Sequence, residues 1–150
     1  MLGGGFFAEL AATAMLAIAL AWVCLSDLRH YRIPDRASLP LLATGLCLSF
    51  ILGVTAPSEA LLGAAAGYCV FRVIGAIHFR MRGVEGLGLG DAKLLGAAGA
   101  WLGWQPLAGL VAGASLSALA FAVITGQRRL AFGPWLAGAF WLIWVGRISA

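Results

Sequence analysis

Apolar residues occur in six long stretches along this chain, and short polar or glycine-containing breaks separate them. The stretches cover residues 6–26, 38–56, 60–78, 89–104, 107–125 and 132–147. A helix rises about 1.5 Å per residue, so about 20 apolar residues cross the roughly 30 Å hydrocarbon core of a bilayer. The pattern predicts an all-α fold: a polytopic membrane helix bundle of about six transmembrane helices. We expect a single integral-membrane domain over residues 1–150, without room for a second, soluble domain.

The fourth stretch is the weakest of the six. Asp91 and Lys93 fall in its first turn, and Gln105 and Pro106 close it early. We therefore expect this segment to be short, tilted or partly interfacial.

Composition supports a membrane protein. Hydrophobic residues make up 62% of the chain, charged residues only 11%, and mean hydropathy is +0.96. A soluble domain of this size could hardly hide so much apolar surface. The net charge of +4 indicates topology signals and lipid-headgroup contacts rather than nucleic-acid binding. Because no Lys or Arg precedes the first stretch, it lacks the charged region of a secretory signal and is expected to remain as the first span.

The cations predict the orientation. Eight of the ten fall at the breaks after the first, third and fifth stretches: Arg29, Arg32, Arg36, Arg80, Arg82, Lys93, Arg128 and Arg129. By the positive-inside rule these breaks face the cytoplasm and both termini lie on the other side.

We interpret the cysteine residues and the spaced glycine residues as structural. Cys24, Cys47 and Cys69 form no Cys-x-x-Cys pair and are expected to be small buried apolar residues. Small residues four apart favour close helix packing in lipid. Such pairs are Gly63 with Gly67, Gly96 with Ala100, and Gly109 with Gly113.

Four acidic residues fall at the predicted cytoplasmic ends of spans: Asp27, Asp35, Glu85 and Asp91. Carboxylates are costly in a bilayer and are often functional there. Considered alone, Asp27 is explained more simply by an ion pair with Arg29 or Arg32 than by catalysis. Asp35 suits a cap on the next helix N-terminus, and Glu85 suits a solvated loop.

Asp91 is less easily explained by structure alone, because Gly86, Gly88 and Gly90 alternate just ahead of it. Alternate glycines allow close backbone approach and unusual dihedral angles, but the Lys-Ser/Thr of a phosphate-binding loop is missing. A peptide chain lying beside a carboxylate fits better. Paired with Asp27, Asp91 would share one proton, so that one carboxylate activates water and the other polarises the scissile carbonyl. This chemistry needs no metal, nucleophilic serine or cofactor, and the sequence leaves open which aspartate holds the proton.

Three blocks in order resemble the type IV prepilin peptidases, which are membrane aspartic peptidases with a Gly-x-Gly-Asp signature. The first is Asp27 followed by Ile33-Pro34, the second runs from Gly86 through Asp91 to Trp104, and the third is Ala131-Phe132-Gly133-Pro134. The resemblance implies that Asp27 and Asp91 are the catalytic pair. It also assigns substrate contacts to Gly88, Gly90 and Lys93.

The resemblance further implies a multi-pass protein of the bacterial cytoplasmic (inner) membrane. Such an enzyme would cleave the short basic leader of prepilins or pseudopilins at the cytoplasmic face, in type IV pilus or secretion systems that the sequence does not distinguish. Two positions depart from the family: Asp35 replaces the usual Asn, and Ala131 the usual Pro. The methyltransferase segment with paired cysteines is missing from this sequence, so we expect the compact peptidase-only form without methyl transfer.

Some alternatives stay open at this stage. Lys93 is expected either to bias the pair toward ionisation or to pair with lipid phosphate or Glu85, and His30 and His78 are expected to be interfacial or solvated. A small transporter or proton-relay subunit would use Asp27 and Asp91 as ion-binding carboxylates. A presenilin-type protease and an inactive homologue that escorts pilins are further rivals. The oligomeric state is not predicted.

Overall fold

The fold was analysed in a computed structural model that describes residues 3–83, 88–127 and 130–149. Its regular structure is entirely helical in these ranges, which confirms the all-α prediction. The helices are α1 (Gly3–His30), α2 (Asp35–Leu52), α3 (Pro57–Arg82), α4 (Leu89–Leu102), α5 (Leu107–Thr125) and α6 (Gly133–Ser149). Each predicted stretch therefore corresponds to one helix.

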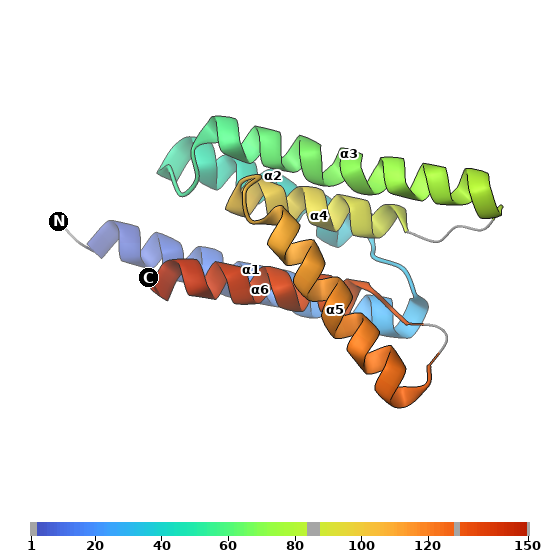
Figure 1. The fold of residues 1–150 in the computed structure, drawn as a ribbon. Coiled ribbons are helices and arrows are strands. Elements are labelled where there is room, and N and C mark those ends of the chain that lie inside the picture. Colours follow the sequence, from blue (N-terminus) through green and yellow to red (C-terminus); the bar gives the residue numbers. More distant parts are fainter. Residues whose placement is uncertain (1–2, 84–87, 128–129, 150) are drawn as a thin grey trace.

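The helices run back and forth between two ends of the bundle (Figure 1). The connections α1–α2, α3–α4 and α5–α6 lie at one end, which we call the cationic end because the eight cations named above adjoin these connections in sequence. Both chain termini lie at the opposite end, as does Arg147 in the last turn of α6. The predicted grouping of these three connections at one end, opposite both termini, is confirmed, whereas Arg128 and Arg129 lie outside the described residues.

Four of the described helices are long and apolar enough to cross a membrane. They are α1, α2, α3 and α5, with spans of Phe7–His30, Asp35–Leu52, Pro57–Met81 and Leu107–Thr125. At about 1.5 Å per residue, the 14 residues of α4 extend only about 21 Å. The fourth helix is therefore short, as its flanking charges indicated.

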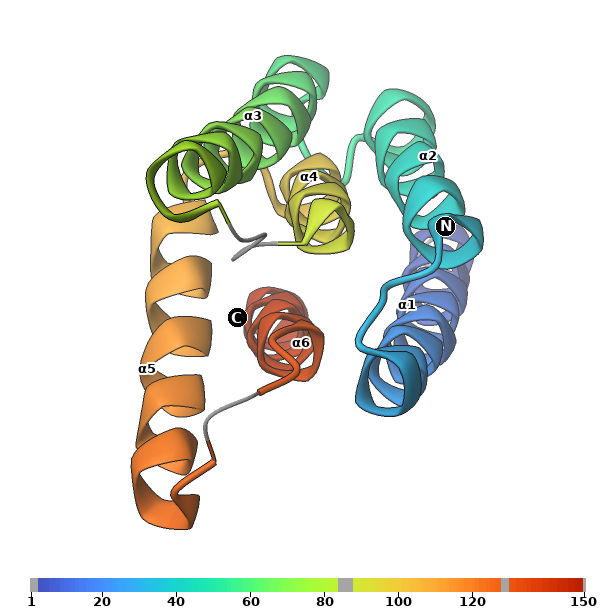
Figure 2. The same ribbon diagram turned by 90° about the vertical axis from the view of Figure 1, so that its right-hand side faces the viewer.

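The central position in the bundle belongs to α4. Viewed along the bundle, it lies among α2, α3 and α6, and α5 packs more loosely at the side (Figure 2). From Leu94 to Leu102 every residue of α4 is buried. A helix that is apolar on all sides belongs in such a position, and its two charged residues, Asp91 and Lys93, fall at the start that faces the cationic end.

Glycine lets α3 and α4 approach until their backbones touch. A side chain on Gly63 or on Gly99 would collide with the backbone of the other residue, and one on Gly67 would lie 2.6 Å from the Leu95 carbonyl oxygen. These contacts confirm the predicted packing role of the pair Gly63 and Gly67. By contrast, a side chain on Gly109 or Gly113 would meet no atom within 4 Å, so that predicted pair does not pack within the protein.

A tryptophan joins α4 to α2 and α6. Trp101 is 1% exposed, and its indole N–H donates to the Leu41 carbonyl oxygen at 2.8 Å. Its ring meets Trp144 of α6 edge to face, with centroids 5.1 Å apart. A buried indole N–H is costly without a partner, so this hydrogen bond fixes where Trp101 can sit.

At the opposite end, Arg147 joins three parts of the chain. Its guanidinium donates to the Thr55 hydroxyl at 3.0 Å and to the Val54 carbonyl oxygen at 2.6 Å, both in the α2–α3 turn. A third contact reaches the Leu102 carbonyl oxygen at the end of α4. Arg147 is not among the eight cations named above, and nothing in the sequence pattern indicated these contacts.

The cysteine prediction is only partly correct. Cys24 is half-buried, whereas Cys47 and Cys69 are exposed on the outer surface of the bundle. All three are free thiols. The prediction of burial within the protein was wrong for Cys47 and Cys69 because a membrane helix directs apolar residues outward as well as inward, and composition does not separate the two faces.

Replacing Gly63 by alanine is predicted to destabilise the bundle. The new methyl group would meet the Gly99 backbone, which has no flexible atoms to move aside, and overpacking of this kind costs about 1–3 kcal/mol. Gly109→Ala is the matched control, because it adds the same methyl group in open space. In thermal unfolding in detergent we expect a lower midpoint for G63A than for G109A. Equal midpoints would contradict the proposed backbone contact.

Candidate functional site

A cavity of about 390 Å³ opens at the cationic end between the α1–α2 connection and the start of α4. Both sequence-predicted aspartates line it. The complete lining is Asp27, Tyr31, Arg32, Ile33, Asp35, Gly88, Leu89, Gly90, Asp91 and Lys93. Residues 64 positions apart in sequence, Asp27 and Asp91, thus share one space.

Asp27 lies in the last turn of α1 and is almost completely enclosed, with 6% of its surface exposed. Its Oδ2 accepts a hydrogen bond of 2.8 Å from the backbone N–H of Gly133, the first residue of α6. The ion pair with Arg29 or Arg32 considered from the sequence is not present, since Lys93–Asp35 is the one salt bridge among the described residues. The partner of Asp27 is therefore a backbone amide from a distant helix.

Asp91 is the third residue of α4, which is not among the four helices that can span a membrane. Burial and the nearby charge of Asp27 raise the pKa of this carboxyl group to about 7, against a smaller opposing effect of the Gly88 amide, which hydrogen-bonds it. At neutral pH a large fraction of Asp91 is therefore protonated. Two carboxyl groups in such a cavity can hold one proton between them.

The glycines ahead of Asp91 differ in what they do. Gly88 is exposed at the N-cap of α4 and leaves that side of the cavity open. Gly90 permits close packing within the protein, because a side chain there would lie 2.7 Å from Cβ of Ile33. Neither has a positive φ, so the unusual dihedral angles considered from the sequence are not found. Gly86 lies outside the described residues.

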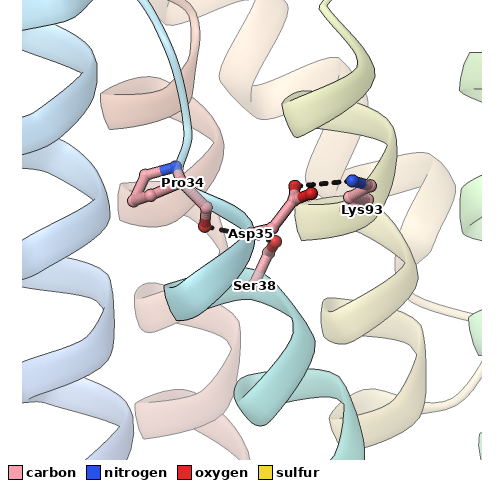
Figure 3. A network of polar contacts seen from close by, with 4 residues as sticks. All are labelled: Pro34, Asp35, Ser38 and Lys93. Carbon is pink, nitrogen blue, oxygen red and sulfur yellow. Dashed lines mark hydrogen bonds and ion pairs between the residues drawn. The ribbon is translucent and has the colours of Figure 1, made fainter.

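Asp35 and Lys93, which both line the cavity, form an ion pair between α2 and α4 (Figure 3). Lys93 Nζ lies 2.5 Å from Asp35 Oδ1, and the pair links the first residue of α2 to the fifth residue of α4. The predicted capping role of Asp35 was wrong: Pro34 is the N-cap of α2, and no side chain caps it. The partners expected for Lys93 from the sequence were the aspartate pair, a lipid phosphate and Glu85, and Asp35 was not among them. Glu85 lies outside the described residues.

The α1–α2 connection has a distinctive backbone. Tyr31 adopts φ of 51°, unusual for a residue with a side chain, and its N–H donates to the Asp27 carbonyl oxygen at 2.8 Å. Ser26 Oγ donates to the Arg32 carbonyl oxygen at 3.1 Å. The connection thus folds back over the end of α1 and brings Ile33, which is 8% exposed, onto Gly90.

The histidines take no part in this cavity. His30 is exposed and His78 half-buried, and neither lines it. Within the described ranges, no three His, Cys, Asp or Glu side chains gather in a way that would hold a metal ion.

Sequence reasoning missed two contributors to the site. Gly133 was noted as part of a motif entering the last helix, but nothing in the motif indicated contact with Asp27. Tyr31 carries no recognisable signal, because its positive φ arises from the folded connection.

Comparison with known proteins gives a consistent result. The model of the type IV leader peptidase family matches residues 14–123, which include Asp27 and Asp91. A prepilin leader peptidase/N-methyltransferase of Escherichia coli (strain K12) is 42% identical over 121 residues, covering 74% of this chain and 52% of that relative. The protein of the same name from Aeromonas salmonicida (strain A449) is 36% identical over 148 residues, covering 90% and 51%.

A third relative of that name, from Dickeya chrysanthemi, is 42% identical over 135 residues, covering 84% of this chain and 47% of the relative. The chain thus spans about half the length of the curated relatives that it matches. No solved structure matches it significantly. The match over most of the chain, together with the cavity that joins the two aspartates of the motif blocks, establishes that this multi-pass membrane protein belongs to the type IV leader peptidase family.

Proposed function

We propose that this protein is a membrane aspartic endopeptidase that removes the leader peptide of type IV prepilins or pseudopilins. The observation that carries the proposal is the placement of Asp27 and Asp91 on one cavity at the cationic end. Three relatives from different organisms carry the name prepilin leader peptidase/N-methyltransferase, which supports the choice of substrate.

The proposed reaction is hydrolysis by a pair of carboxyl groups. The ionised carboxylate takes a proton from water, and the water oxygen attacks the carbonyl carbon of the scissile peptide bond. The protonated carboxyl group gives its proton to the carbonyl oxygen, which forms a tetrahedral intermediate. When the C–N bond breaks, the leaving nitrogen takes up the proton that the first carboxyl group removed from water, and a hydroxyl group of the intermediate returns its proton to the other carboxylate. One water is consumed, a carboxyl and an amino terminus form, and the pair is left with one proton as at the start.

The position of the cavity suits a substrate that is itself a membrane helix. Asp27 and Asp91 lie at the ends of their helices on the cationic side, which the positive-inside rule directs to the cytoplasm of a bacterial inner membrane. A leader can then reach the cavity from water while the apolar segment of the substrate stays in lipid. Gly88 leaves room for an extended backbone beside Asp91.

A transporter or proton relay is not favoured. That alternative requires the carboxylates near the middle of the membrane, whereas Asp27 is four residues from the start of the α1–α2 connection and Asp91 is in the first turn of α4. The names of the relatives also describe peptidases.

Asp27→Asn and Asp91→Asn are each predicted to abolish leader cleavage. A carboxamide neither takes a proton from water nor gives one to the carbonyl oxygen, and general acid–base catalysis contributes about 10²–10⁴-fold. The measurement is the fraction of a co-expressed prepilin that loses its leader, with membrane levels of each variant checked by immunoblot.

Asp35→Asn is the matched control, because it makes the same chemical change on the same cavity. Asp35 is exposed and pairs with Lys93, and exposed ion pairs contribute only about 0–1 kcal/mol, so D35N is expected to process most of the substrate. Processing by D27N or D91N at the wild-type level would refute the catalytic pair.

Cleavage is predicted to decline as the pH rises above about 7. The raised pKa of Asp91 means that the pair loses its shared proton in this range, and the form with two carboxylates has no acid to protonate the carbonyl oxygen. Initial rates of purified enzyme in detergent, measured from pH 5 to 9 with a peptide or prepilin substrate, test this. A rate that stays constant up to pH 9 would contradict it.

A further inference from the structure

The first turn of α6 directs one backbone amide at Asp27. Helices begin with N–H groups that have no partner inside the helix. Here Trp135 and Leu136 donate theirs to the Phe132 carbonyl oxygen, each at 3.1 Å, and Pro134 has none. Gly133 donates to Asp27 Oδ2 at 2.8 Å, so the remaining N–H of this turn is used to bind a carboxylate from α1.

The position requires glycine. A Cβ atom on residue 133 would lie 2.6 Å from Asp27 Oδ2, closer than real Cβ atoms approach, and 3.0 Å from Cγ, which is also tight. Protein encloses Asp27 and leaves only 6% of its surface exposed, so its carboxylate has little room to move away from residue 133. The carboxylate therefore occupies the space that a side chain on residue 133 would take.

A backbone N–H pointing at a carboxyl oxygen favours the ionised form, because an anion accepts a stronger hydrogen bond than a neutral acid does. The N-terminus of α6 adds the positive end of a helix dipole on the same side. Burial opposes ionisation at both carboxyl groups, but at Asp91 the nearby charge of Asp27 adds to the effect of burial and raises the pKa to about 7. The shared proton is therefore held more readily by Asp91 than by Asp27.

We infer that Gly133 is a positioning residue that holds Asp27 in the ionised form, so that Asp27 activates the water and Asp91 donates the proton. The inference rests on the proposed peptidase function and adds an assignment of roles within the pair. Gly133 itself touches neither water nor substrate in this scheme. It acts through Asp27, by donating its N–H and by having no side chain.

Other titratable groups around Asp27 set the background for this effect. The first turn of α6, residues 133–136, contains no titratable side chain. The groups that share the cavity or the same end of α1 are Cys24, Arg29, His30, Tyr31, Arg32, Asp35, Asp91 and Lys93. Lys93 is engaged by Asp35, and within the described residues the hydrogen-bond donor to the Asp27 carboxylate is the Gly133 amide.

The first test is the pH profile of Gly133→Ala, with Gly138→Ala as the matched control in the same helix. A methyl group on residue 138 meets nothing within 4 Å. In G133A the carboxylate must move off the amide, so protonation of Asp27 becomes easier. We expect kcat to fall about tenfold or more and the acidic limb of the profile to move up by about one pH unit, whereas G138A should match the wild type.

A purely structural role for Gly133 would lower the amount of active enzyme equally at every pH. An acidic limb that stays in place in folded G133A would therefore overturn the inference.

The second test needs no substrate and no steric variant. In the wild-type protein labelled with ¹⁵N-glycine, the Gly133 amide signal should shift as the pH is lowered through the acidic limb, because the acceptor changes from carboxylate to carboxyl. In Asp27→Asn that shift should disappear. A Gly133 signal that does not respond to pH, or that responds equally in D27N, would overturn the inference. A wild-type enzyme that fails to cleave prepilins would refute the proposed function but leave this titration intact, so the two failures are distinguishable.

Discussion

The arrangement of the bundle depends on how closely the neighbouring helices can pack around α4. Half of its 14 residues are glycine or alanine, and this lets α3 approach until Gly63 and Gly99 bring their backbones into contact. In lipid there is no hydrophobic force between helices, so close packing and interhelical hydrogen bonds must supply the association. The Trp101 indole provides one such hydrogen bond and Arg147 others. A short helix enclosed in this way has a fixed starting point, and Asp91 lies in that first turn.

The polar groups of the site are supplied by helix ends that meet at the cationic end. Asp27 comes from the end of α1, Asp91 from the beginning of α4, and the amide of Gly133 from the beginning of α6. A carboxylate is expensive within a bilayer, and here each one is near a helix N-terminus, where unpaired N–H groups and the helix dipole favour negative charge. The packing that brings these helix ends together thus provides an environment in which two carboxyl groups can be held close to the membrane.

Much of the fold was predictable because membrane helices follow simple rules. The apolar stretches predicted all six helices, the cations predicted which connections share an end, and the charges within residues 89–104 indicated that α4 is short. Side-chain partners were less predictable. Asp35 was expected to cap α2 but pairs with Lys93, 58 positions away, and Cys47 and Cys69 face outward. In each case a local pattern was compatible with several partners, and the choice depended on helices distant in sequence.

The sequence alone determined the solvent in which the protein folds, the number of helices, and the presence of carboxyl groups and glycines in an order typical of one family. These properties follow from hydropathy, charge and spacing along the chain, which are local. Only the tertiary structure decided that Asp27 shares a cavity with Asp91 and accepts the N–H of Gly133, 106 positions away. The physical reason is that a hydrogen bond between helices forms only when the distance between its donor and acceptor is correct to within a few tenths of an ångström. These distances are set by how closely small residues allow the helices to pack.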